Sequence, residues 1–191
     1  EQHVMVNTYG PKRVTDAFLP LIDKKEGRVV MVSSAAGPMF VRDCSKKVQA
    51  KLTNPNITWA EVKSFADDNI AMATRDEDAY QAKGYPKKSP YYLSKALLNC
   101  LTMIYARTHP NLVVSAVTPG FIETDLTRSA LLNKSGKTAK EMGMKSIDEG
   151  AHAPCKCLFS KLDGSGWYWG SDGLRSPLDA YRGPGDPEYK P

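Results

Sequence analysis

The sequence lacks the features that would place it in a membrane, in a disulfide-rich secreted class or on nucleic acid. No apolar run approaches the roughly 20 residues that cross a bilayer as a helix, so no membrane span is expected. The four cysteines, Cys44, Cys100, Cys155 and Cys157, lack the spacing of a disulfide framework, which predicts a cytoplasmic or other reducing compartment. The net charge of +5 comes from scattered lysines without a basic stripe, so nucleic-acid binding is not expected.

The sequence also shows no spacing typical of a metal site and no recognisable targeting signal. Cys155 and Cys157 lie close to His152, but residues two apart on a helix face different directions and no second ligand pair is near, so no metal site is expected. The chain starts with Glu1 rather than Met, so targeting stays unknown. Its 191 residues, 41% hydrophobic and 25% charged, suffice for one domain or most of one.

Three short apolar segments predict parallel strands near residues 28 to 33, 112 to 118 and 167 to 170. The first stops at Ser33-Ser34 and the second at Pro119-Gly120, so hydroxyls and a turn follow the carboxyl ends of two strands. Open α/β sheets bind ligands outside those ends. The pattern favours an α/β doubly wound parallel sheet with its ligand site there.

Tyr91 and Lys95 stand four residues apart, a spacing that places a phenol and an ammonium on one face of a helix. A neighbouring cation favours the phenolate form, so such a pair can transfer protons to and from an oxygen atom. The spacing alone occurs by chance in many helices. The order of the other motifs around it strengthens the interpretation.

That order resembles the short-chain dehydrogenase/reductase family, most closely its carbonyl reductase branch. Asn7 stands in a predicted helix, Ser34 follows a strand, Tyr91 and Lys95 come next, and Pro119-Gly120 with Thr124 come last. The resemblance covers roughly residues 1 to 175. About 55 residues separate Ser34 from Tyr91, and this insertion is the feature that points to the carbonyl reductase branch.

The resemblance implies a role for each matched position. Tyr91 would be the general acid and base, Lys95 would assist it and hold the nicotinamide ribose, and Ser34 would hydrogen-bond the substrate oxygen. Asn7 would fix its helix and support a water that relays protons. Pro119, Gly120, Ile122 and the Thr124 hydroxyl would meet the nicotinamide carboxamide. The implied reaction is reduction of a small carbonyl substrate, or oxidation of an alcohol, with NADP or NAD, of which the resemblance favours NADP.

Three assignments carry alternatives. Successive strand residues face opposite sides, so only one of Ser33 and Ser34 can point into the site, and the family pattern favours Ser34. Tyr92 could share a face with Lys95, although the motif spacing selects Tyr91; it could equally pack against the sheet or a neighbour. Asn7 could be a helix cap.

The insertion, at about residues 40 to 88, reads as helical. Thr58 and Glu61 form a capping box that opens one of its helices, and Ser146 with Glu149 form another farther along. In the carbonyl reductase branch such an insertion is implied to block a helix dimer surface, which predicts a monomer. It could line the substrate pocket or only cover the sheet.

The sequence lacks the glycine-rich turn that brings a pyrophosphate to a helix N-terminus, although it has 14 glycines. We therefore expect only the C-terminal portion of a Rossmann-like fold, without the N-terminal cofactor-binding half. Two explanations stay open. The residues could be part of a longer enzyme, or they could form a catalytically inactive structural or assembly subunit whose open sheet edge is covered by a protein partner.

The last segment, 176–191, differs in composition from the predicted reductase portion, 1–175. It carries Pro177, Pro184, Pro187 and Pro191 with Gly183 and Gly185, so it is predicted to run extended over the surface. A docking arm for a partner and a disordered tail are both consistent with this composition.

Overall fold

The computed structural model describes residues 2–72, 77–86, 90–129 and 133–191, and its centre is a parallel sheet. Strands β1 (Arg28–Val32), β2 (Val113–Val117) and β3 (Trp167–Trp169) lie side by side in parallel, in the order β1-β2-β3-β4. The three predicted parallel strands are confirmed. Strand β4 (Arg175–Ser176) pairs antiparallel with β3 and was not predicted, since two residues carry no periodicity.

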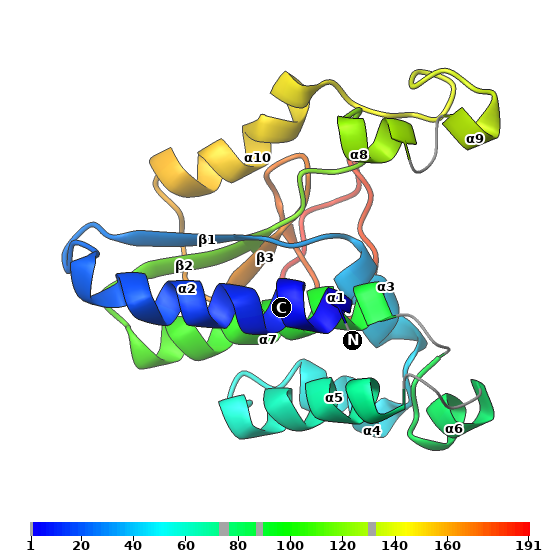
Figure 1. The fold of residues 1–191 in the computed structure, drawn as a ribbon. Helices are drawn as coiled ribbons and strands as arrows, with labels where there is room; N and C mark the ends of the chain where they lie inside the picture. The colour runs from blue at the N-terminus through cyan, green and yellow to red at the C-terminus, as the bar shows by residue number, and fades with distance from the viewer. Residues whose placement is uncertain (1, 73–76, 87–89, 130–132) are drawn as a thin grey trace.

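Helices cover both faces of the sheet, as a doubly wound fold requires (Figure 1). Helix α10 (Ile147–Phe159) packs on β1 and β2 from one side, whereas α2 (Gly10–Phe18) and α7 (Pro90–Thr108) lie on the other. Helix α7 supplies much of the core, and its Leu93, Leu97 and Leu101 are fully buried. The capping box of Ser146 and Glu149 forms at the start of α10 as predicted.

The helical insertion between Ser34 and Tyr91 is confirmed. Four helices are described in it: α3 (Ala36–Asp43), α4 (Lys46–Leu52), α5 (Trp59–Ala71) and α6 (Glu77–Ala82). Thr58 and Glu61 form both hydrogen bonds of their capping box at the start of α5. Helices α3, α4 and α5 pack against α7. Residues 73–76 and 87–89 of this stretch lie outside the described residues.

The first helical stretch buries less of its apolar face than its sequence pattern suggests. It contains α1 (Gln2–Val4), a π-helical turn at Met5–Tyr9, α2, and a 3₁₀ turn at Leu19–Leu21. The amphipathic pattern runs through Val14, Phe18, Leu19, Leu21 and Ile22, and of these only Leu19 and Ile22 pack against the core. The other three are more than half exposed, because β1 is an edge strand of the described sheet and no described element lies beyond it.

The remaining described elements are short. Helices α8 (Asp125–Thr127) and α9 (Asn133–Ser135) lie between β2 and α10. All four cysteines are free thiols, and Cys155 alone of the four is exposed. Across the described ranges, no helix is both long enough and apolar enough to cross a membrane.

The position of α7 in the core generates a stability prediction. Leu97→Ala should lower the free energy of unfolding by about 2–5 kcal/mol, because it leaves a cavity at a fully buried position. Leu126→Ala is the control at a largely exposed position and should change it by less than about 0.5 kcal/mol. Urea denaturation measures both, and equal effects of the two substitutions would contradict the assignment of α7 to the core.

Candidate active site

A cavity of about 1000 Å³ lies at the carboxyl ends of the three parallel strands. Its lining includes residues that directly follow each strand: Ser34 to Ala36 after β1, Thr118 to Ile122 after β2, and Ser171 after β3. Ligands of open α/β sheets bind at this edge. Of the positions predicted for the site, Ser34, Tyr91, Pro119, Gly120, Ile122 and Thr124 line this cavity.

Tyr91 and Lys95 lie on adjacent turns at the start of α7. The Lys95 ammonium is 5.8 Å from the centre of the Tyr91 ring and donates a hydrogen bond of 3.1 Å to the carbonyl of Val32, the last residue of β1. Lys95 does not line the cavity; it lies behind Tyr91. Desolvation by burial lowers the pKa of Lys95 below its ordinary value.

The two serines after β1 have different surroundings. Ser34 lines the cavity, and its hydroxyl oxygen accepts a hydrogen bond of 3.2 Å from the amide of Ala36. A serine hydroxyl that accepts one bond can still donate its own hydrogen to a ligand. Ser33 is buried, and its hydroxyl lies 3.3 Å from the carbonyl oxygen of Lys95, to which it donates. The structure thus brings Ser34, and not Ser33, to the cavity.

Asn7 acts on the helix that carries Tyr91. Its amide donates a hydrogen bond of 3.1 Å to the buried Ser94 hydroxyl, which in turn donates one of 2.7 Å to the carbonyl of Tyr91. Asn7 lies inside the π-helical turn, so the helix-cap alternative is wrong. Single π-helical turns inside helices are frequent at functional sites. Asn7 is not among the residues that line the cavity.

The turn after β2 forms another part of the lining. Gly120 has a φ of +94°, which favours glycine, and an added Cβ would lie 3.0 Å from the Cβ of Ser171. Thr124 lines the cavity, but its hydroxyl also caps α8 by accepting from the amide of Thr127 at 3.4 Å. The Thr124 and Thr127 hydroxyl oxygens also lie 3.2 Å apart, so a carboxamide oxygen would compete with Thr127 for the hydrogen of the Thr124 hydroxyl.

The lining also contains Tyr92, which the motif spacing had set aside in favour of Tyr91, and residues of the C-terminal segment that the sequence analysis did not connect with the site. Tyr92 lines the cavity beside Tyr91, with the two rings 6.1 Å apart and edge to face. Tyr181, Arg182 and Pro184 reach the cavity from the C-terminal segment. Their proximity to Ser34 is a tertiary contact, and no local sequence signal could have shown it.

Of the described residues of the insertion, Ala36 and Met39 of α3 line the cavity, whereas none in 40–72 or 77–86 does. The first helix of the insertion therefore forms part of the cavity wall, and its other described helices cover α7.

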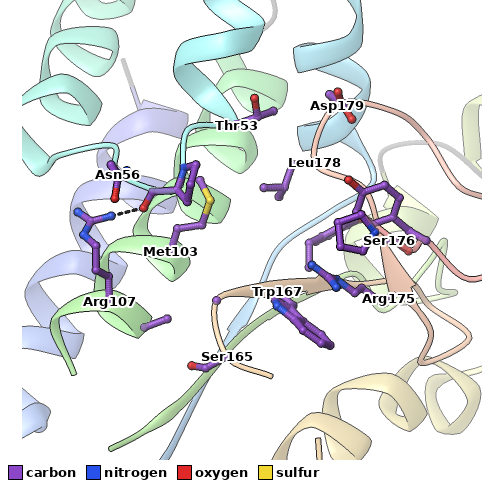
Figure 2. A pocket seen from close by; sticks show the side chains of 16 residues that line it. Thr53, Asn56, Met103, Arg107, Ser165, Trp167, Arg175, Ser176, Leu178 and Asp179 are labelled. Atoms are coloured by element: carbon purple, nitrogen blue, oxygen red, sulfur yellow. Dashed lines mark hydrogen bonds between the residues drawn. The ribbon is translucent and has the colours of Figure 1, made fainter. Parts of the chain in front are cut away.

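A second cavity, of about 660 Å³, lies near the end of α7 and the start of β3. Figure 2 shows Arg175 stacked on Trp167 on one side of it and Met103 and Arg107 on the other. Its lining contains none of the positions predicted for the site.

The lowered pKa of Lys95 predicts how stability depends on pH. Between that pKa and the ordinary lysine value of about 10.4, the unfolded chain binds more protons than the native chain, so this residue makes the free energy of unfolding rise with pH. Lys95→Met should lose this rise, so wild type should gain stability relative to the variant as pH increases through this window. Urea denaturation from pH 7 to 10.5 measures the difference. The exposed Lys63→Met is the control, and a constant difference for Lys95→Met would contradict the prediction.

The proteins to which this chain is similar in sequence are dehydrogenases and reductases. No protein-family model matches the sequence. The chain is 33% identical over 160 residues to a (+)-neomenthol dehydrogenase of Arabidopsis thaliana, covering 82% of this chain and 49% of the relative. It is 30% identical to short-chain dehydrogenase/reductase 1 of Saponaria officinalis, covering 85% of this chain and 50% of the relative.

A mammalian relative and a solved structure agree with the plant relatives. The chain is 29% identical to carbonyl reductase [NADPH] 1 of Macaca fascicularis, over 87% of this chain and 56% of the relative. Menthone neomenthol reductase of Mentha piperita matches with a TM-score of 0.62 and 25% identity, over 88% of this chain and 49% of that one. The chain thus spans about half the length of these relatives, and it belongs to the short-chain dehydrogenase/reductase family.

Proposed function

We propose that the polypeptide carrying this chain is an NAD(P)H-dependent oxidoreductase that reduces a carbonyl compound or, in reverse, oxidises an alcohol. One observation carries the proposal. Tyr91 and Ser34 line one cavity at the carboxyl ends of the strands, with Lys95 directly behind Tyr91 and Asn7 linked through Ser94 to the same turn. The relatives described above are named as dehydrogenases or reductases, which supports catalysis and does not support an inactive structural subunit.

In this proposal, the chain's own residues handle the oxygen atom of the substrate. Reduction of a carbonyl builds negative charge on oxygen, and a donor aimed at that oxygen stabilises the transition state. Tyr91 donates the proton that converts the oxygen to a hydroxyl, and Ser34 donates a hydrogen bond to the same atom. Lys95, held by the Val32 carbonyl, supplies positive charge next to Tyr91. Asn7 positions the turn that carries Tyr91 through Ser94.

The residues around the cavity fit a nicotinamide. Gly120 brings a backbone turn without a side chain to the cavity, and Ile122 and Thr124 add an apolar contact and a hydroxyl donor. With Pro119, Lys95 and Tyr91, these residues would hold the nicotinamide end of NADP or NAD. When bound, the nicotinamide supplies the hydride. The name of the relative carbonyl reductase [NADPH] 1 supports NADP over NAD.

We further propose that the substrate is a small-molecule carbonyl or alcohol compound and that the protein is a monomer. Helices α3, α4 and α5 pack on α7, so these faces of α7 are not free for a helix-to-helix dimer contact, which supports the monomer. A reducing compartment, such as the cytoplasm, agrees with the four free thiols.

Tyr91→Phe keeps the ring and removes only the hydroxyl that donates the proton. We expect kcat for reduction of a simple ketone to fall roughly 100-fold or more, because general acid catalysis is lost. Tyr92→Phe is the matched control, since Tyr92 lines the same cavity one position further on, and it should lose far less. Cofactor absorbance at 340 nm follows both rates, and comparable losses in the two variants would reject Tyr91 as the acid.

Ser34→Ala removes one donor to the substrate oxygen. We expect kcat to fall by about 100- to 1000-fold, the usual effect of losing such a donor. Ser33→Ala removes the adjacent hydroxyl, which bonds the Lys95 carbonyl, and should lower stability more than kcat. Steady-state kinetics together with thermal unfolding of both variants separate these effects. A Ser33→Ala enzyme with the lower kcat would contradict the assignment.

A further inference from the structure

The C-terminal segment forms part of the cavity that holds Tyr91 and Ser34. Tyr181, Arg182 and Pro184 line this cavity, far in sequence from the residues that follow the strands. The segment was expected to be an extended docking arm or a disordered tail. Residues 177–191 contain no helix or strand, as an extended course over the surface predicts, and they contact the rest of the chain; docking of a partner stays a prediction. The predicted boundary between residues 175 and 176 falls inside β4.

An ion pair holds the segment in place. Both terminal nitrogens of the Arg182 guanidinium bind the Asp172 carboxylate, at 2.6 to 2.8 Å, and the Arg182 side chain is only 5% exposed. A planar guanidinium and a carboxylate that meet in this way fix both distance and orientation. Asp172 directly follows Ser171, which lines the cavity and would contact a Cβ at Gly120. The ion pair therefore connects the segment to the turn between β3 and β4, whose Ser171 lies beside the turn after β2.

The remaining Arg182 donors also bind within the segment. Its Nε donates to the Ser176 hydroxyl at 3.2 Å, and one terminal nitrogen donates to the carbonyl of Gly183 at 3.0 Å. Every guanidinium nitrogen therefore has a partner in the chain. Arg182 has no role left as an anion-binding group, and the side chains that the segment offers a substrate are Tyr181 and Pro184.

A second attachment lies farther along. The amide of Tyr189 donates to the carbonyl of Arg175 at 3.1 Å, and the amide of Arg175 donates to the Glu188 carboxylate at 3.1 Å. The Arg175 guanidinium stacks on Trp167, 3.7 Å from the ring centre (Figure 2). Residues 177 to 187 are thus held at both ends by β4, and Tyr181 lies between these attachments.

The lining opposite is mostly apolar. Met39, Phe121, Ile122 and Ile147 share the cavity with Tyr181 and Pro184. Tyr181 is one of the lining residues, and about half of its surface is exposed. A cavity of about 1000 Å³ has room for a cyclic or aromatic compound as well as for a short chain.

We propose that Tyr181 is a specificity-determining residue that favours bulky apolar carbonyl compounds, and that Arg182 is its positioning residue through Asp172. The inference rests on the proposed function. Tyr181 shares the cavity with Tyr91 and Ser34 but comes from a different segment of the chain. In this proposal, a substrate whose carbonyl oxygen lies at Tyr91 and Ser34 gains the contact with Tyr181 through the part of the molecule that a short substrate lacks.

The test uses the full polypeptide with NADPH and two ketones, butanone and the bicyclic aromatic 1-tetralone. Tyr181→Ala should lower the ratio of kcat/KM for 1-tetralone over butanone about tenfold, mainly through KM, because an aromatic contact is lost. Tyr189→Ala is the matched control, since Tyr189 belongs to the same segment but lines the second cavity. It should leave the ratio unchanged. An unchanged ratio in Tyr181→Ala overturns the proposal.

Asp172→Asn tests the positioning role. This substitution should lower the ratio of kcat/KM for 1-tetralone over butanone, as Tyr181→Ala does. Arg182→Lys should lower the ratio less than Arg182→Gln, because lysine keeps the positive charge that pairs with Asp172. A general loss of folding would lower kcat for both ketones together and leave the ratio constant, which would overturn the positioning role.

A binding measurement separates this proposal from the proposed function. If the wild type reduces neither ketone with NADPH or NADH, the proposed function fails, and calorimetry with the unreactive 2-naphthamide still tests Tyr181. Wild type should bind 2-naphthamide about tenfold more tightly than Tyr181→Ala. Absence of binding to the wild type, or equal binding to both proteins, overturns the role of Tyr181.

Discussion

The close contact between helix α7 and the end of strand β1 is the constraint on which the site depends. The ammonium of Lys95 reaches the carbonyl of Val32, and the hydroxyl of Ser33 reaches the carbonyl of Lys95, so strand and helix bind each other in both directions. Gly37, on the helix α3 that follows β1, lets α3 approach α7 closely at the same place, since an added Cβ there would lie 3.1 Å from the backbone of Lys95 and Ala96. Tyr91, one turn earlier on α7, is thereby directed to the cavity beside Ser34.

The π-helical turn and the helices of the insertion hold α7 in place on its other sides. The π-helical turn bonds Ser94 through Asn7 and through the buried Thr8, whose hydroxyl meets the Ser94 carbonyl at 3.3 Å. Helices α4 and α5 of the insertion pack on α7 from another side. These contacts are consistent with a first turn of α7 that keeps its position when a ligand enters the cavity.

Features with a local cause were predictable from the sequence. The capping boxes at Thr58 and Ser146 need only residues three apart, and the strands are apolar runs bounded by turns. The rule that ligands bind at the carboxyl ends of parallel strands predicted a site at Ser34, and the resemblance to the family implied that Tyr91 belongs to the same site. The four-residue spacing of Tyr91 and Lys95 occurs by chance in many helices, and only the order of the motifs along the chain indicated the family.

Features with a tertiary cause were not predictable. Tyr181 lines the cavity next to Arg182, which pairs with Asp172 ten residues earlier, and Arg and Asp are too common for that pairing to be predicted from the sequence. Val14, Phe18 and Leu21 read as a buried face but are exposed, since burial depends on what lies beyond β1. Thr124 caps α8 as well as lining the cavity, and its role in cofactor binding stays a prediction.

The most direct test of the account is a crystal structure of the full polypeptide with NADP and an unreactive carbonyl-containing inhibitor. The account predicts the inhibitor's carbonyl oxygen within about 3 Å of both the Tyr91 and the Ser34 hydroxyl, the usual length of such hydrogen bonds. A carbonyl oxygen bound by other residues, or an inhibitor in the second cavity beside Trp167, would contradict it.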